Sequence, residues 1–240
     1  MLPQGRCDYL LRFAIVSCIN QKIGYRRLSL IRALVKSASW ATGMPQIPSK
    51  EFKRLPLRVH AFLGDVPLHD VWAIDLPRGP GGITLAEFLR RTGDLFRRPP
   101  PVVRALLSAR FFVGGLFGWD RATLGSLSQS FAQRLTEEDR AQSLEPAGTA
   151  DGLFRIVYRF ENEQLDEIIN RTVHAGVLSA LAETSEGYRF YLAVYVREVS
   201  CFTLLYMAAI NPFRKLIVYP LLLRSIADQW NAAFILSNYK

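Results

Sequence analysis

Cysteine and histidine are both scarce in this sequence. Its 240 residues include three cysteines and three histidines. Cys7, Cys18 and Cys201 are an odd number and form no C-x-x-C pair, which argues against both a disulfide framework and a zinc site. No cluster of histidine, cysteine and carboxylate residues has the spacing of a metal site or a catalytic centre. The sequence therefore predicts no metal, no cofactor and no catalytic residue, and it favours a binding protein over an enzyme.

Long apolar runs are also absent. No stretch reaches the roughly 18 apolar residues that a membrane-spanning helix needs. Residues 10–19 are too few and carry Arg12, while residues 201–223 are interrupted by Arg214 and Lys215 near their middle. The apolar residues near the start are not followed by the small-residue cleavage site of a secretory signal. Together with the lack of a disulfide framework, these absences predict a cytoplasmic protein.

Acidic residues are few in one part of the chain only. The net charge of +9 is concentrated in residues 1–56, where ten lysines and arginines face two acidic residues, while the remaining residues hold 20 basic and 19 acidic side chains. A nearly neutral body lacks the broad basic face that neutralises phosphates, and its aromatic residues stand in apolar runs instead of alternating with arginine. The sequence therefore argues against nucleic acid as a partner of the body.

The basic segment is expected to form an N-terminal extension, residues 1–43, before a single domain of residues 44–240. Apolar residues recur at helical spacing over residues 1–40, and arginines and lysines fill much of the rest, which predicts a basic amphipathic helix. Three interpretations stay open. The extension is a helix on an anionic membrane surface, a partly disordered arm, or upstream sequence with Met44 as the true start.

A strand and a helix are predicted in the first part of the domain. Residues 71–77 are typical of a strand that ends at Pro77, and a turn rich in glycine and proline follows. Thr84 is then a suitable N-cap. Glu87, three residues later, completes a capping-box pattern, so we expect a helix from there to about Arg91.

A second helix is predicted over residues 102–119, after three consecutive prolines, because apolar residues recur there at helical intervals. Its glycines are not followed by the Gly-Lys-Ser/Thr of a phosphate-binding loop. Residues 121–150 are polar and predict a surface connection, with a short helical turn at residues 131–135.

The chain then changes to a period of two. Four segments are separated by links too short for crossover helices, which predicts successive antiparallel strands in a meander with one polar and one packed face. Three charged residues within strand-like segments, Asp75, Arg155 and Glu198, are expected to point outward. The four segments are residues 154–160, 165–169, 173–181 and 188–196.

Beyond residue 200 the spacing becomes helical again. The pattern predicts a helix of roughly 25 residues that kinks at Pro212 and Pro220, because proline lacks a backbone donor and clashes with the preceding turn. So broad an apolar surface needs cover on more than one side. We therefore predict an α+β protein in which a curved antiparallel β-sheet wraps around a long C-terminal α-helix. The predicted buried stripe of this helix is Leu205, Tyr206, Ala209, Phe213, Leu216, Ile217, Pro220 and Leu221.

Three segments resemble a known bacterial family. They are Leu57-Arg-Val-His60, His69-Asp-Val-Trp-Ala-Ile-Asp-Leu-Pro77 and Leu204-Leu-Tyr-Met-Ala-Ala-Ile-Asn-Pro-Phe-Arg-Lys-Leu-Ile-Val218. Over about residues 50–225 the chain resembles domain of unknown function 2867, which is similar to the START-like, birch-allergen-like (SRPBCC) superfamily. The resemblance implies a helix-grip fold that encloses a cavity for lipids, sterols, polyketides or other apolar molecules. The closing motif of the family usually has histidine after Pro-Phe, where this chain has Arg214.

Aromatic residues supply the candidate contacts to such a ligand. Their rings are suited to a cavity wall, and phenol groups are suited to hydrogen-bond one end of the molecule, although most aromatic residues in such positions are simply core residues. The predicted ligand-binding residues are Trp72, Tyr158, His174, Tyr191, Tyr195 and Tyr206.

The leading prediction for function is a binding protein that holds a small hydrophobic or amphipathic molecule, such as a lipid, between the sheet and the C-terminal helix. One alternative is an enzyme of the cyclase or dehydratase type with a cavity-facing His69 or His174. His69 and Asp70 would form a dyad only where the chain turns, because neighbouring residues of a strand point to opposite sides. The other alternative is a membrane-surface protein in which residues 1–43 make the peripheral contact.

Overall fold

Six antiparallel strands form the centre of the structure. The computed structural model describes residues 46–77, 82–92, 100–108, 130–170, 173–199 and 201–238. The strands lie in the order β1-β6-β5-β4-β3-β2, and each neighbouring pair is antiparallel. They are β1 (Leu68–Pro77), β2 (Ala150–Asp151), β3 (Phe154–Arg159), β4 (Glu163–Ile169), β5 (His174–Thr184) and β6 (Gly187–Arg197).

The predicted meander is confirmed from β3 to β6, where each strand pairs with the next one along the chain. The links are short, as antiparallel neighbours permit. The strand predicted at residues 71–77 is also confirmed as part of β1, which pairs with β6 at the edge of the sheet. The α+β fold class is therefore confirmed, while the helix-grip arrangement stays a prediction.

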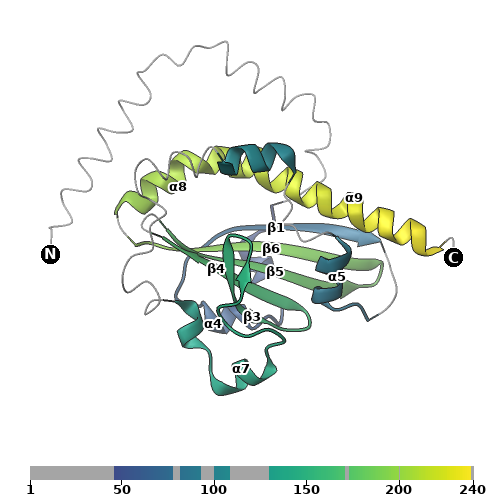
Figure 1. Cartoon of the computed structure of the whole chain (residues 1–240), viewed down its shortest axis with the longest axis horizontal. Coiled ribbons are helices and arrows are strands. Elements are labelled where there is room, and N and C mark those ends of the chain that lie inside the picture. The colour runs from purple at the N-terminus through teal and green to yellow at the C-terminus, as the bar shows by residue number, and fades with distance from the viewer. Residues whose placement is uncertain are drawn as a thin grey trace, which may run out of the picture.

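Both faces of the sheet are buried, so the prediction of one polar face is wrong. The first eight residues of β5 are all buried, and they alternate between two hydrophobic clusters. Val177 and Leu181 belong to the cluster on what we call the C-terminal face, which the C-terminal helices cover. Leu178 and Ala180 belong to the cluster on the opposite face, called the N-terminal face, which short helices cover. Figure 1 shows the two layers on either side of the sheet.

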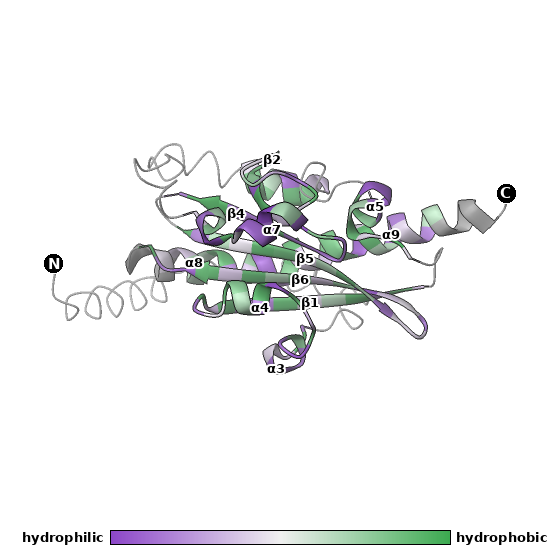
Figure 2. Cartoon of the chain, turned by 90° about the horizontal axis from the view of Figure 1, so that it is seen from below, coloured by the Kyte–Doolittle hydropathy of each residue, from purple (hydrophilic) through white to green (hydrophobic). Residues whose placement is uncertain are grey.

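The N-terminal face is covered by α3 (Ser49–Phe52), α4 (Val59–Phe62) and η3 (Phe131–Arg134). The turn predicted at residues 131–135 is confirmed as η3, a 3-10 helix. A helix that the sequence reading missed, α7 (Glu137–Gln142), follows directly, and Thr136 and Asp139 form its capping box. Figure 2 shows hydrophobic residues along much of the strands, whereas α7 is largely hydrophilic.

The helix predicted after Thr84 is confirmed as α5 (Leu85–Arg91), and the Thr84 side chain accepts a hydrogen bond from the Glu87 backbone nitrogen at 3.3 Å. Residues 101–108 are helical, in agreement with the start of the second predicted helix. The rest of that prediction, and the N-terminal extension of residues 1–43, lie outside the described residues.

Three consecutive helical segments form the C-terminal layer: α8 (Cys201–Phe213), the π-helix η4 (Arg214–Val218) and α9 (Tyr219–Asn238). The two prolines fall on either side of η4. Figure 1 shows α8 and α9 meeting at a bend, which agrees with the predicted change of direction in this region.

The predicted buried stripe of the C-terminal helix is confirmed at Tyr206 and Pro220 and is wrong at Ala209, Phe213 and Leu216. Tyr206 is buried, but Phe213 and Leu216 are 48% and 52% exposed. The π-helix holds more residues per turn than an α-helix, so it rotates the residues of α9 that follow it relative to a 3.6-residue pattern. It does not account for the exposure of Ala209 and Phe213, which precede it. The residues of α9 that face the sheet are therefore Tyr219, Leu222, Leu223, Ile226 and Trp230.

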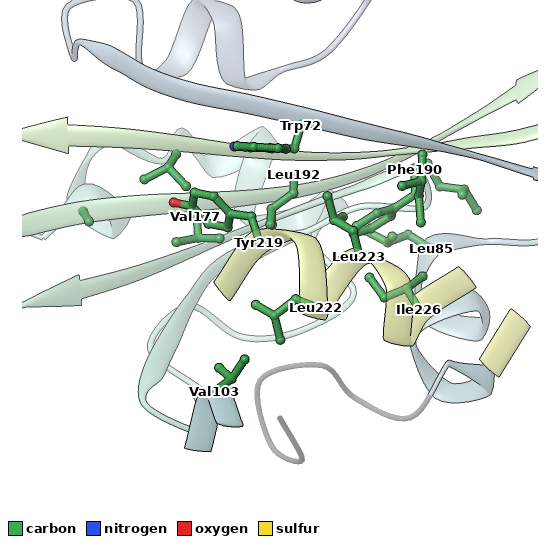
Figure 3. Packing of buried hydrophobic residues seen from close by; sticks show 14 of the residues in the cluster. Trp72, Leu85, Val103, Val177, Phe190, Leu192, Tyr219, Leu222, Leu223 and Ile226 are labelled. Carbon is green, nitrogen blue, oxygen red and sulfur yellow. The ribbon is translucent and has the colours of Figure 1, made fainter. Parts of the chain in front are cut away.

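The layer between the sheet and α9 is filled by side chains (Figure 3). Leu223 and Ile226 have no exposed surface, and Trp230 is 2% exposed. Burying a side chain of this size contributes roughly 1.5–3 kcal/mol to folding. The indole nitrogen of Trp230 also donates to the carbonyl of Pro77 at 3.0 Å, which ties α9 to the end of β1. No helix among the described residues has both the length and the apolar character that crossing a membrane requires.

Candidate functional site

A cluster of charged side chains lies where β1 begins. The pairing of β1 with β6 is irregular between Leu68 and Asp70. At this irregularity His69 and Asp70 meet despite being neighbours in sequence, with Nδ1 of His69 2.9 Å from Oδ2 of Asp70. The chain does not turn here, and it is the irregular pairing within the strand that lets the two side chains meet.

Asp70 joins β1 to the π-helix. Its side chain has no exposed surface, and it pairs with Nη2 of Arg214 at 2.7 Å and with Nζ of Lys215 at 3.1 Å. Burial acts to raise the pKa of Asp70, but hydrogen bonds from His69 and Lys215 and the charge of Arg214 outweigh it and hold the pKa below its usual value. The carboxylate is thus ionised at neutral pH, with both cations around it.

Arg214 also contacts Tyr219 at the start of α9. Its Nε and Nη2 donate to the Tyr219 hydroxyl oxygen, and its guanidinium carbon lies 5.2 Å from the ring centre. The Tyr219 ring in turn lies 5.4 Å from that of Trp72 on β1. Burial raises the pKa of Tyr219 to about 12, although Arg214 opposes this rise, so the phenol stays neutral. We call His69, Asp70, Arg214, Lys215 and Tyr219 the Asp70 cluster.

A cavity of about 350 Å³ lies at the other end of β1 and β6. Ala180 is the last residue of β5 that pairs with β4, and β5 continues to pair with β6 as far as Thr184. The β5–β6 hairpin therefore extends beyond β4 at this end. Gly82 lies at the cavity with a φ of 73°, a conformation that side-chain-bearing residues rarely adopt. The described lining residues are Leu55, Pro56, Leu57, Gly82, Ile83, Thr84, Glu161, Asn162, Ala180, Leu181, Ala182, Glu183, Tyr188 and Tyr191.

Glu163 is a buried acid on the N-terminal face. Its carboxylate accepts a hydrogen bond from the backbone nitrogen of Arg58 at 2.6 Å, at the start of α4. Burial raises the pKa of Glu163 to about 7, against the opposing effect of the backbone donors. Burial and the nearby carboxylate of Glu163 also raise the pKa of Tyr158 and of Tyr195.

His174 is held on the same face by a second buried acid. Its Nε2 lies 3.1 Å from Glu167, and its ring stacks on Phe131 at 3.9 Å between ring centres. Glu167 also accepts a hydrogen bond from the Phe131 backbone nitrogen at 2.9 Å and one from the Ser130 hydroxyl. His174 has no exposed surface. These contacts describe a histidine that attaches η3 to the sheet.

The six predicted ligand-binding residues do not share one cavity. Trp72 and Tyr206 lie on the C-terminal face. Tyr158, Tyr191 and Tyr195 lie on the N-terminal face, as does His174. Tyr191 lines the described cavity, and the other five do not. Ligand binding by these residues stays a prediction.

The sequence analysis did not predict the contacts of the Asp70 cluster or of Glu163. Two signals in the sequence point to a polar site here: Arg214 and Lys215 interrupt an apolar run, and Arg214 stands where the closing motif of the resembled family usually has histidine. Glu163 was placed between two predicted strands. Asp75, Arg155 and Glu198 are exposed, as predicted. Among the residues that the structure describes, no group of three or more histidine, cysteine or acidic side chains could hold a metal ion.

The fold and these sites define an α+β protein built on a six-stranded antiparallel sheet with helices on both faces. Residues 62–221 match the family described as "Protein of unknown function (DUF2867)". This match spans most of the chain, which therefore belongs to that family, as the sequence motifs predicted. The wider relation to the START-like superfamily stays a prediction. No curated protein matches the chain.

Proposed function

We propose that the protein binds a small amphipathic molecule in the cavity at the end of β5. The observation that carries this proposal is the mixed wall of the cavity, which combines apolar side chains such as Leu57 and Ile83 with polar residues such as Thr84 and Asn162. Ligand sites are typically clefts of roughly 300–1,000 Å³ with a mostly apolar lining and a few polar groups. A volume of about 350 Å³ suits a small ligand.

The proposed ligand lies outside the layer between the sheet and the C-terminal helix. In that layer the described side chains pack against one another as the cluster of the C-terminal face. The cavity instead draws on both faces: Ile83 and Tyr188 adjoin the C-terminal cluster, and Leu55 and Tyr191 adjoin the other. A relation to the START-like superfamily favours the same class of ligand but implies a different position for it.

Binding is favoured over proton transfer at this cavity. Neither His69 nor His174 is among its described lining residues. The acidic residues that line it, Glu161 and Glu183, are exposed. Exposed carboxylates have no desolvated environment that would adapt them to acid–base chemistry.

The test is native mass spectrometry of the purified protein, followed by denaturing extraction and identification of any bound molecule. The variant Ala182→Phe places a large side chain in the cavity wall, and Ala61→Phe makes the same change at an exposed position of α4. We expect a bound amphipathic molecule in the wild type and in Ala61→Phe, and its loss in Ala182→Phe. A ligand that survives in a folded Ala182→Phe variant would place binding elsewhere.

A second arm covers a ligand that is lost on purification. The fluorescent amphiphile 8-anilinonaphthalene-1-sulfonate is titrated into the wild type and both variants. We expect saturable binding that Ala182→Phe weakens about tenfold or more, in keeping with the loss of a well-packed ligand contact. Equal binding to all three proteins would contradict the proposal.

A further inference from the structure

We propose that the Asp70 cluster binds the carboxylate or phosphate group of a small organic anion. The cluster is a separate site from the proposed ligand cavity. Asp70 pairs with Val194, whereas Leu76 pairs with Tyr188 at the cavity. The two positions lie six residues apart along β1, which corresponds to roughly 20 Å.

The Asp70 cluster has more positive than negative charge. One buried carboxylate, that of Asp70, faces the guanidinium of Arg214 and the ammonium of Lys215. Arg214 and Lys215 together therefore carry one more positive charge than the carboxylate of Asp70 balances. Asp70 is also partnered by the amide of Gln46 at 3.4 Å, which adds a donor and no negative charge. Buried or half-buried charges are normally paired, so the surplus favours an anion.

The cluster also has hydrogen-bond donors that an anion could engage. Nε and Nη2 of Arg214 donate to Tyr219 and Asp70. Among the described residues, the hydrogen-bond partner of its Nη1 is the sulfur of Met207 at 3.7 Å, and a thioether is a weak acceptor. Lys215 has three donors, and its side chain is 35% exposed. Guanidinium and ammonium groups with free donors are the usual partners of carboxylates and phosphates.

An unpartnered buried donor points to the same place. Trp72 is 7% exposed, and its indole Nε1 has no hydrogen-bond partner among the described residues. Trp72 lies two residues after Asp70 on β1, so both side chains are on the same face of the strand. Figure 3 shows the indole nitrogen of Trp72 and the hydroxyl of Tyr219 pointing toward the same side. An unpaired buried N–H costs about 1–3 kcal/mol, and an anion oxygen would satisfy it.

Asn211 and His69 add selectivity for the rest of the molecule. The carboxamide oxygen of Asn211, one turn before Lys215, is buried and has no partner among the described residues. His69 uses Nδ1 for Asp70 and is 28% exposed, which leaves Nε2 for solvent or ligand. One nitrogen of a neutral imidazole accepts and the other donates. A hydroxyl group on the anion would pair with either residue, so hydroxylated carboxylates and sugar phosphates are the preferred class.

Histidine-ring NMR tests the site in the unmodified protein. The chain has three histidines, His60, His69 and His174, and only His69 belongs to the cluster. Phenyl phosphate, benzoate and glycolate are titrated into protein with labelled imidazoles, and His69→Gln assigns the signal. We expect a saturable shift of the His69 resonances with His60 and His174 unchanged. No saturable shift of His69 with any of the three anions would overturn the proposal.

Lysine variants show whether the binding is specific to the cluster. Lys215→Met keeps the apolar stem and removes the charge, Lys215→Arg restores a charge, and Lys53→Met removes a charge from an exposed position elsewhere. We expect Lys215→Met to lower the affinity for the anion that binds the wild type by about tenfold or more. The other two variants should bind this anion nearly as tightly as the wild type does. Equal weakening by Lys53→Met would show a general charge effect and contradict the proposal.

Discussion

The carboxylate of Glu163, on β4, accepts a hydrogen bond at 2.6 Å from the backbone nitrogen of Arg58, which lies 105 residues earlier in the chain. Arg58 precedes α4 and provides no side-chain cap for it. The first N–H groups of a helix lack partners within the helix, so a residue of the sheet supplies the cap here. Glu167 does the same for η3 at the backbone nitrogen of Phe131. Two glutamates four residues apart therefore anchor the layer on the N-terminal face.

Glu163 should make stability depend on pH between about 5 and 8. Its pKa is raised from 4.5 to about 7 in the folded protein. Because the folded value lies above the unfolded one, the stabilisation is fully present below about pH 4.5 and is lost as the pH rises through 7. A shift of this size corresponds to about 3 kcal/mol. We expect Glu163→Gln to remove this loss, as measured by urea unfolding at pH 5, 6, 7 and 8.

The difference between variant and wild type isolates Glu163 from other titrating groups. Burial lowers the pKa of His60, but this effect contributes equally to both proteins and cancels in the difference. Glu186→Gln, in the exposed turn between β5 and β6, is the matched control and should keep the wild-type pH dependence. A parallel pH profile for Glu163→Gln and the wild type would show that Glu163 does not titrate in this range.

Asp139 should stabilise the attachment of α7. It accepts from Nε and Nη2 of Arg58 at 2.8 and 2.9 Å and forms the capping box with Thr136. The hydrogen bonds from Arg58 lower its pKa to about 2, so its contribution is present above about pH 4 and is lost as the pH falls through 2. We expect Asp139→Asn to cost about 2 kcal/mol at pH 7 in urea unfolding. Glu137→Gln in the same turn should cost less than about 0.5 kcal/mol, and equal effects of both changes would contradict this role.

Two aspartates of β1 provide an internal comparison of buried and exposed ion pairs. Asp70 has a fully buried side chain between Arg214 and Lys215, whereas the side chain of Asp75 is 71% exposed and pairs with Arg189 at 2.5 Å. Removing one partner of a buried pair leaves charge without compensation, so Asp70→Asn should lower the free energy of unfolding by roughly 3 kcal/mol. Asp75→Asn should lower it by less than about 1 kcal/mol. Similar losses in thermal or urea unfolding would show that Asp70 is not buried among cations.

Local sequence patterns predicted the strands and the helix ends that depend on neighbouring residues. The alternation from Phe154 onward predicted β3 to β6, and Thr84 with Glu87 predicted the start of α5. The pattern did not predict that both faces are covered. The sequence of β5 carries this information, because His174-Ala-Gly-Val-Leu-Ser-Ala-Leu181 is mostly apolar or small on both sides, which is typical of a strand buried on both faces.

The Asp70 cluster could not be predicted from local patterns. Its main ion pair joins residues 144 positions apart. It also depends on two irregularities, the shifted pairing at Leu68 and Asp70 and the π-turn at Arg214–Val218. A π-turn changes the side on which later residues lie, so a 3.6-residue pattern continued through it does not predict which residues of α9 face the sheet. Irregular turns of this kind are frequent at functional sites.

Trp230 should be the main attachment of α9 to the sheet. It is 2% exposed, its ring centre lies 5.5 Å from that of Phe88, and its indole nitrogen donates to the carbonyl of Pro77. We expect Trp230→Ala to cost about 4 kcal/mol, because a large cavity forms in the core. Trp230→Phe, which keeps a ring and loses the hydrogen bond, should cost about 1.5 kcal/mol. Urea unfolding followed by far-ultraviolet circular dichroism measures both values.

An exposed neighbour of Trp230 provides the control. Asn231 lies next on α9 and is exposed, so Asn231→Ala should change the free energy of unfolding by less than about 0.5 kcal/mol. If Trp230→Ala were as mild as this control, α9 would not be packed on the sheet. We expect the loss of stability to be largest for Trp230→Ala, smaller for Trp230→Phe and smallest for Asn231→Ala. The difference between the two Trp230 variants separates the contribution of ring burial from that of the hydrogen bond to Pro77. Loss of the ring must cost more than loss of the hydrogen bond alone, because the ring contacts α5 and β6 as well as the end of β1.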